Sequence, residues 1–140
     1  MIDIENKIVD TVTNAVTAIY ADCLVVSVPT RNPAEFPCVS IYEADNAVYQ
    51  PARTLSEVET HASLMYEVNV YSNLEYGRKG QAKDIAAVVD ATMEKLGFQR
   101  TFKSPLPNED VTIYRLTMRY KATVSQAIIN GTKYIYKIYQ

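Results

Sequence analysis

Between Glu57 and Ser72 the chain alternates between hydrophobic or small residues and polar ones. Every second position from Val58 to Val70 belongs to the first set, and most positions between them are polar. Successive side chains of a strand point to opposite faces of a sheet, so this pattern predicts a long strand with one buried face. The turn-forming residues 73–77 end it.

A helical spacing of apolar residues follows the strand. The apolar positions are Ala82, Ile85, Ala86, Val89, Met93 and Leu96, and they recur every three or four residues. They predict an amphipathic helix that ends at Gly97, where a left-handed cap belongs. A short segment, 98–103, and a turn at 105–110 come next. From Tyr114 to Val124 hydrophobic and polar residues alternate again, which predicts another strand.

The N-terminal part of the chain predicts one helix and two short strands. Residues 3–21 carry apolar residues at helical spacing, with Asp3 as the expected N-cap. Two strands are expected at 23–28 and 36–43, joined by a Pro-containing loop at 29–37. We expect these two strands to form an antiparallel pair.

Two further segments are expected to extend from the sheet. Residues 45–56 are irregular and contain Pro51, which favours a long projecting loop. Residues 126–140 contain Asn130-Gly131, the strongest short hairpin signal in the sequence, between apolar and Tyr-rich stretches. The expected fold is therefore α+β: one domain over residues 1–140, with a mixed, mainly antiparallel sheet packed by two helices and a C-terminal β-hairpin extension.

Composition excludes some classes of protein. With 48% hydrophobic residues, 21% charged residues and a net charge of -2, neither a disordered chain nor a strongly basic nucleic-acid coat is favoured. Cys23 and Cys38 lie in apolar strand-like runs, so we expect reduced, buried thiols. No apolar run approaches the roughly 18 residues of a membrane span, so no membrane partner is expected.

The sequence contains little that indicates catalysis. His61 shares a strand face with Glu59, but two candidate ligands do not make a metal site, and a solvated or interface position is favoured. Gly77 to Gly80 lacks the spacing and the Lys-Ser/Thr ending of a nucleotide-binding loop, so a turn and helix cap are expected there. We expect no catalytic residue, cofactor or bound metal.

Association with other chains is a better explanation of the surplus features. The strand predicted at 57–72 is longer than usual. The terminal hairpin is rich in Tyr, a residue enriched where protein surfaces meet. The candidate interface residues are Glu57, Glu59, Arg115, Arg119, Tyr134 and Tyr136. If the contact joins two different surfaces of identical subunits, repetition can close a ring. The alternative is that both extensions fold back over their own sheet.

Three segments resemble the tail terminator, or tail completion, proteins of long-tailed bacteriophages. They are residues 66–72 (YEVNVYS), 82–97 with Phe98 after them, and 110–120 (DVTIYRLTMRY). The resemblance includes the order of elements over about residues 3–124 and has no invariant motif. Residues 126–140 continue beyond the part that matches.

The resemblance implies a structural virion protein that is assembled in the host cytoplasm. Such a protein forms a hexameric ring on the tail tube, ends tail polymerisation and offers a joining surface to the neck. Its partners would be copies of itself, the tail tube protein and a neck or head-completion protein. DNA would pass through the lumen without sequence-specific binding, which fits a near-neutral chain.

Two other interpretations stay open at this point. The first is a neck or head-completion connector of the same particle, because both kinds of protein are small α+β ring subunits. The second is a small α+β ligand-binding domain or enzyme that uses a pocket between sheet and helices. A ring subunit should assemble, whereas a ligand-binding domain should stay small and gain thermal stability from its ligand.

Overall fold

A computed structural model describes residues 1–48, 61–129 and 133–139, with the backbone alone for 126–129, 133–137 and 139. The elements in chain order are α1 (Glu5–Thr17), β1 (Leu24–Val26), β2 (Cys38–Val48), β3 (His61–Ser72), α2 (Arg78–Leu96), β4 (Gln99–Leu106), β5 (Tyr114–Ile129) and β6 (Lys133–Tyr139). This confirms the predicted α+β class, with two helices and a mainly antiparallel sheet.

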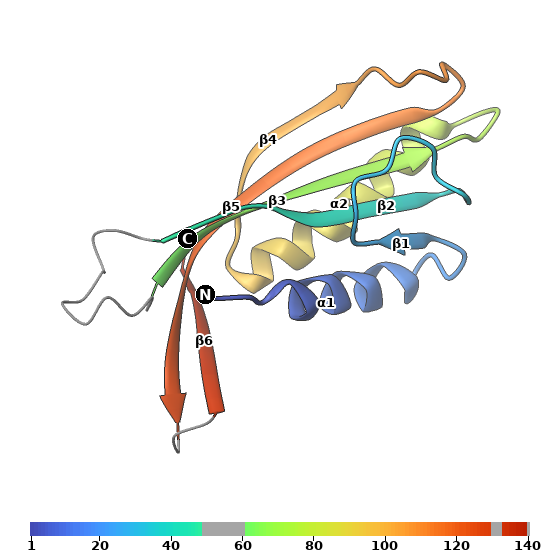
Figure 1. The fold of residues 1–140 in the computed structure, drawn as a ribbon. Helices are drawn as coiled ribbons and strands as arrows, with labels where there is room; N and C mark the ends of the chain where they lie inside the picture. Colours follow the sequence, from blue (N-terminus) through green and yellow to red (C-terminus); the bar gives the residue numbers. More distant parts are fainter. Residues whose placement is uncertain (49–60, 130–132, 140) are drawn as a thin grey trace.

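The sheet has the strand order β1-β2-β3-β5-β4, and β6 pairs with β5 away from this path. All neighbours are antiparallel except β1 and β2. Both helices lie against one face of the sheet, below it in Figure 1, where they also contact each other. We call the other side of the sheet the open face.

The antiparallel pairing that we predicted for the first two strands is wrong. β1 runs parallel to β2, with Leu24 beside Cys38 and Val26 beside Ser40. The connection 27–37 therefore has to return along the sheet instead of making a tight hairpin. Side-chain bonds hold it there: Ser40 Oγ donates to the carbonyl of Val28 at 2.7 Å, and Tyr71 Oη donates to the carbonyl of Thr30 at 2.6 Å.

The expectation of a loop from residue 45 is also wrong for its first four residues. β2 continues to Val48, and the remainder, 49–56, lies outside the described residues. A register shift between Glu43 and Asp45 interrupts the alternation along this strand. A bulge of this kind changes which face each later residue occupies, so a strict period of two cannot be read through it.

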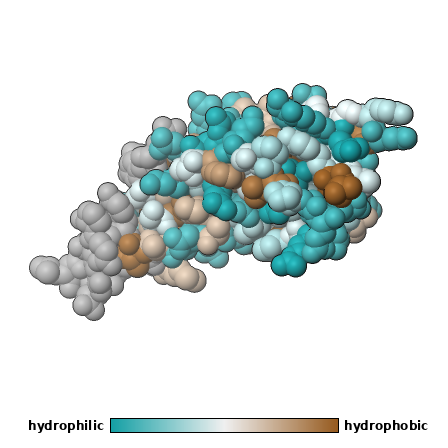
Figure 2. All heavy atoms as spheres, turned by 90° about the horizontal axis from the view of Figure 1, so that it is seen from above, coloured by the Kyte–Doolittle hydropathy of each residue, from teal (hydrophilic) through white to brown (hydrophobic). Residues whose placement is uncertain are grey.

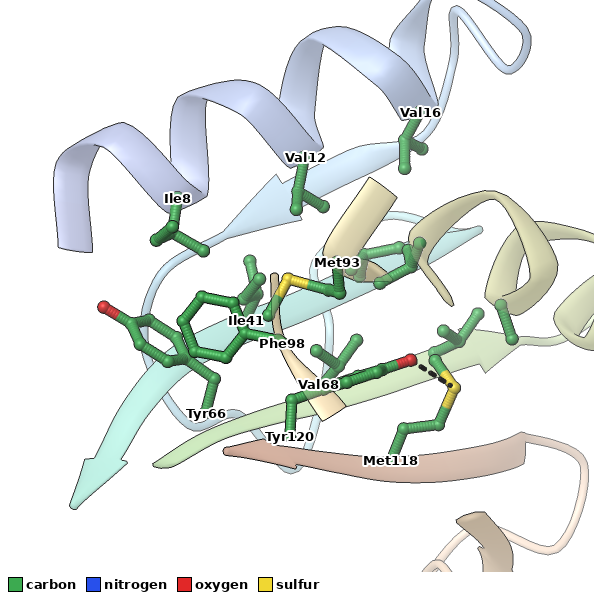
Figure 3. Close-up of a cluster of buried hydrophobic side chains, with 14 of the residues drawn as sticks. Ile8, Val12, Val16, Ile41, Tyr66, Val68, Met93, Phe98, Met118 and Tyr120 are labelled. Carbon is green, nitrogen blue, oxygen red and sulfur yellow. Dashed lines mark hydrogen bonds between the residues drawn. The ribbon is translucent and has the colours of Figure 1, made fainter. Parts of the chain in front are cut away.

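The core between helices and sheet is built from the residues that the two periodicities indicate (Figure 3). Ile8, Val12 and Val16 of α1 are fully buried, as are the predicted α2 stripe from Ala82 to Met93 and the even-numbered residues of β3. The Tyr66 and Phe98 rings meet edge to face, with centroids 5.3 Å apart. The predicted buried faces are therefore confirmed for α2 and for residues 61–72 of the long strand. For the first helix the prediction holds from Ile8 to Val16, but α1 ends at Thr17 and Ile19 is exposed.

The helix ends match the prediction in part. Gly97 caps α2 in the left-handed conformation at φ 98°, as expected, and Gly77 precedes the helix at φ 82°. For α1 the N-cap is Ile4, where Asp3 was expected. Asp3 still satisfies one free helix donor, because the N–H of Glu5 donates to its Oδ1 at 3.1 Å.

β5 is long enough to pair with three other strands. Its first part pairs with β3 and β4, and residues 123–129 pair with β6, which confirms the predicted C-terminal hairpin. The turn 130–132 lies outside the described residues. The β5–β6 ribbon leaves the sheet on the side where the helices lie (Figure 1), while Ile138 of β6 packs against the core.

Candidate functional site

The structure places only some of the predicted interface residues. Glu57 and Glu59 lie outside the described residues. Tyr134 and Tyr136 lie on β6, paired through the backbone with Ile128 and Gln126 of β5.

The other two candidates, Arg115 and Arg119, lie on β5. Both contact side chains of neighbouring strands of their own chain, described next.

The open face carries a line of three polar side chains and one phenylalanine ring across four strands. Tyr42 of β2, Glu67 of β3, Arg119 of β5 and Phe102 of β4 occupy successive positions in register. Tyr42 Oη donates to Glu67 Oε2, and Arg119 Nε donates to Glu67 Oε1 at 3.1 Å. The Arg119 guanidinium lies 5.0 Å from the centre of the Phe102 ring, within the range of a cation–π contact.

A second line beside it is more deeply buried. Asn69 Oδ1 accepts from Thr117 Oγ1 at 2.6 Å and from Arg115 Nε at 3.0 Å. Arg115 also lies 6.0 Å from the centre of the Tyr71 ring. Because their hydrogen bonds are made within the sheet, Asn69 and Thr117 can be buried on this face at little cost.

These contacts set the ionisation of the open face. Burial alone would raise the pKa of Glu67, but the hydrogen bonds from Tyr42, Asn69 and Arg119 together lower it. Burial, followed by the bond to Glu67, raises the pKa of Tyr42 to about 12. Glu67 is therefore a stable carboxylate at neutral pH. Viewed from above, this side of the molecule is largely hydrophilic (Figure 2).

A hollow of about 380 Å³ lies where the loop after β1 meets the open face. It is lined by Pro29, Thr30, Arg31, Tyr42, Asn69 and Arg115. Arg31 is exposed, whereas Arg115 is half-buried and held by Asn69. Two guanidinium groups without a lining carboxylate give the hollow a positive character that suits an oxyanion.

Three carboxylates form a second charged feature, on the helix side of the sheet. We call Asp3, Glu5 and Glu43 the acidic cluster. The N–H of Glu5 donates to Asp3 and the N–H of Glu43 donates to Glu5 Oε2 at 2.8 Å, so the three are linked through backbone donors. Burial raises the pKa of Glu43, and the charges of Asp3, Glu5 and Asp45 raise it further.

The hydroxyl of Tyr66 faces this acidic cluster. Tyr66 is fully buried, and its Oη has no hydrogen-bond partner among the described residues. Burial raises the pKa of this hydroxyl, and the charges of Glu43, Glu5 and Asp3 raise it further. Figure 3 shows the ring extending from the core, with its oxygen beneath the N-terminal half of α1. A buried hydroxyl without a hydrogen-bond partner lowers the free energy of unfolding.

The two ends of the sheet are different. At the end that we call the loop end lie the connections 18–23, 27–37, 73–77 and 107–113 (Figure 1). These connections carry exposed apolar side chains, namely Ile19, Val28, Leu74, Tyr76 and Val111. The opposite end, the hairpin end, carries the β5–β6 ribbon and the acidic cluster. Met1 and Val48, at the hairpin end, are exposed as well.

The remaining candidates for chemistry are structural or unremarkable. Cys23 and Cys38 are free and buried, as predicted, and burial raises their pKa values to about 11 and about 12, so both thiols are protonated at neutral pH. Within 1–48, 61–129 and 133–139, no group of His, Cys, Asp and Glu is arranged to hold a metal ion. Neither described helix is long and apolar enough to cross a membrane.

Sequence reasoning placed Arg115 and Arg119 on the correct face of β5 but missed their partners. Glu67 and Asn69 were recognisable as polar positions of the preceding strand, yet their pairing depends on a register that no local pattern encodes. It also missed the acidic cluster, since Asp3 and Glu43 are forty positions apart in the sequence.

Neither the protein-family models nor the curated proteins include a match to this chain.

Proposed function

We propose that this chain is the repeating subunit of a ring that caps a bacteriophage tail tube, ends tail polymerisation and joins the tail to the neck. The observation that carries the proposal is the difference between the two ends of the subunit. One end presents loops with exposed apolar side chains, and the other presents the β5–β6 ribbon and the acidic cluster.

Unlike ends allow contacts between different surfaces of identical subunits. Such head-to-tail contacts close a ring when the rotation between neighbours permits it. The loop end supplies apolar area, while the ribbon supplies an extended surface that reaches beyond the last described rung between β3 and β5, His61 with Ser125.

The order of elements also supports the proposal. A helix, two neighbouring strands, a long strand, an amphipathic helix and closing strands follow one another here as in the tail terminator family that the sequence resembles. The resemblance implied an antiparallel first pair, whereas β1 and β2 are parallel here. The sequence has 14 basic and 16 acidic residues, so a ring lumen would not hold passing DNA by bulk charge. In this proposal the protein resides in the tail and neck region of the virion.

The test is assembly of the purified full chain. Size-exclusion chromatography with light scattering should give a closed multimer, and negative-stain electron microscopy should reveal rings. Added to tail tubes, the chain should bind one tip and stop further growth. A chain that remains monomeric at high micromolar concentration and ignores tail tubes would contradict the proposal.

Deletion of the gene separates a terminator from a connector of the same particle. Loss of a terminator leaves tails that are overlong or cannot join heads. Loss of a neck connector leaves finished tails beside heads that release their DNA.

A further inference from the structure

The wall of the hollow on the open face is fixed before any ligand binds. It is formed by the connection 27–37, which passes β2 and reaches the open side of the sheet (Figure 1). The carbonyl of Val28 accepts a hydrogen bond from Ser40 Oγ at 2.7 Å. The carbonyl of Thr30 accepts one from Tyr71 Oη at 2.6 Å. Because both bonds are made within the chain, binding in the hollow of about 380 Å³ does not require this connection to become ordered.

Arg115 lines this hollow with most of its hydrogen-bonding capacity unused. Its Nε donates to Asn69 Oδ1 at 3.0 Å, and its guanidinium lies 6.0 Å from the centre of the Tyr71 ring. The N–H groups of its two terminal nitrogens remain, and none of them donates to another described residue. Arg115 is half-buried, yet it forms no ion pair within the described part of the chain. Charges removed from water are usually paired, so the position suits a negative group.

Arg31 and Thr30 add donors from the connection 27–37. The Arg31 side chain is exposed and makes no hydrogen bond or ion pair with another described residue. Thr30 accepts from Tyr71 through its carbonyl oxygen, whereas its hydroxyl has no partner among residues 1–48, 61–129 and 133–139. Both residues line the hollow together with Arg115. Two guanidinium groups and one hydroxyl can therefore donate to a single ligand.

No carboxylate of the described residues lines the hollow. Glu67 lies beside Tyr42 on the open face, but its oxygens are already bonded. Its Oε1 accepts from Arg119 at 3.1 Å, and its Oε2 accepts from Tyr42 and from Asn69 Nδ2. Because Tyr42 donates its proton to Glu67, the Tyr42 hydroxyl does not donate to a ligand as well. The two guanidinium groups at the hollow are therefore left without a carboxylate of their own.

We propose that the hollow binds a phosphate group, either free or as the monoester of a small molecule, through Arg115, Arg31 and the Thr30 hydroxyl. Two guanidinium charges match a phosphate group, which carries nearly two negative charges at neutral pH, better than a carboxylate, which carries one. The volume of about 380 Å³ leaves room for the organic part of a small ester. The site goes beyond the proposed ring and does not depend on it, because all its lining residues belong to one chain.

The test is isothermal titration calorimetry of the full chain with inorganic phosphate, at an ionic strength held constant with chloride. The variants are Arg31→Gln, Arg115→Gln and Arg115→Lys, of which the last keeps the charge but loses the planar fork. Lys121→Gln is the matched control. It removes a positive charge from the open face, because Lys121 alternates with Arg119 along β5, but Lys121 does not line the hollow. Thermal unfolding without phosphate checks that each variant is folded.

The wild-type chain should bind phosphate with a dissociation constant of about 1 mM or lower. Arg115→Gln should raise this constant about tenfold, and the more exposed Arg31→Gln about threefold, with Lys121→Gln near wild type. Arg115→Lys should fall between wild type and Arg115→Gln. Arg31→Gln should keep the wild-type melting temperature, because the Arg31 side chain has no described partner, so it decides the question even if Arg115→Gln fails to fold.

Four outcomes would overturn the proposal. The first is no binding of phosphate by the wild-type chain up to about 20 mM. The second is an equal loss in Lys121→Gln and Arg31→Gln, which would mean a diffuse positive face. The third is acetate bound as tightly as phosphate, which would mean a carboxylate site. The fourth is duplex DNA bound through Arg31 and Arg115 while phosphate is not. None of these measurements requires assembly, so the site and the ring can fail separately.

Discussion

Glu67 of β3 lies directly opposite Arg119 of β5, with Oε1 3.1 Å from Nε, and the same carboxylate accepts the hydroxyl of Tyr42 from the strand on its other side. One carboxylate thus joins three strands on the open face. The charge of Glu67 therefore contributes to the stability of the sheet itself, independent of assembly.

Glu67→Gln should lower the free energy of unfolding at pH 7 by about 1 kcal/mol, a modest value because Arg119 is 44% exposed. The pKa of Glu67 is lowered in the folded chain from 4.5. Its stabilising contribution is therefore present above pH 4.5 and is lost as the pH falls through the folded value. Urea unfolding at pH 7 and at pH 3 checks this: the difference from wild type should shrink in acid, and a constant difference would contradict it.

Two buried tyrosines on adjacent strands make a matched pair for a second prediction. Tyr120 Oη donates to Asp90 Oδ1 at 2.7 Å, and Asp90 also pairs with Arg100 at 2.9 Å. Tyr66 Oη has no partner among the described residues. Tyr120→Phe should therefore cost about 1–2 kcal/mol of folding free energy, while Tyr66→Phe should be neutral or slightly stabilising. Chemical denaturation of the single subunit measures the change in folding free energy for each variant. A larger loss for Tyr66→Phe than for Tyr120→Phe would contradict these hydrogen-bond assignments.

Local periodicity was sufficient to predict the elements that bury one regular face. The α2 stripe ending at Gly97 and the alternation along β3 both follow from the requirement that a helix or strand bury its apolar side against a common core. For the same reason Arg115 and Arg119 were assigned to the correct face of β5.

The errors arose where long-range contacts decide the structure. β1 and β2 are parallel, and the connection between them is bound by Tyr71, a residue more than thirty positions away. A turn was expected from Pro105, yet β4 continues through Pro105 to Leu106, which an edge strand tolerates because one side of its backbone needs no partner. No local pattern could have placed Tyr66 beside Asp3 and Glu5.

The three glycines around α2 yield a third prediction. Gly77 and Gly97 both have positive φ, but an added Cβ would meet open space at Gly77 and Ile138 Cγ2 at 3.1 Å at Gly97. Gly77→Ala should cost about 1 kcal/mol for the backbone alone, and Gly97→Ala should cost more. Gly80→Ala, inside the helix and in open space, should stabilise by about 0.5–1 kcal/mol. Urea unfolding gives all three values; equal costs at Gly77 and Gly97 would mean that Ile138 yields freely.

Glu43→Gln should stabilise the single subunit at neutral pH. The pKa of Glu43 is raised above 4.5, mainly by burial and then by its acidic neighbours, so the folded state favours the protonated form. The protonated carboxyl of Glu43 therefore contributes to folding stability below pH 4.5, and this contribution is lost as the pH rises through the pKa of Glu43 in the folded chain. At pH 7 the neutral amide should therefore gain about 0.5 kcal/mol, a difference that disappears in acid. Thermal unfolding against pH checks the sign, and destabilisation at pH 7 would contradict it.

Replacing Tyr134 and Tyr136 together by Ser should weaken assembly more than folding. Their backbone rungs, with Ile128 and Gln126, lie beyond the last described rung between β3 and β5, so the main sheet does not depend on them. The control replaces Lys133 and Lys137 of the same strand by Ser. Light scattering should then report smaller particles for the Tyr variant at low micromolar concentration, with melting temperatures of both variants near wild type. If particle size were unchanged, the β5–β6 ribbon would not be a subunit contact, and the head-to-tail interface would have to form from the loop end and the acidic cluster alone.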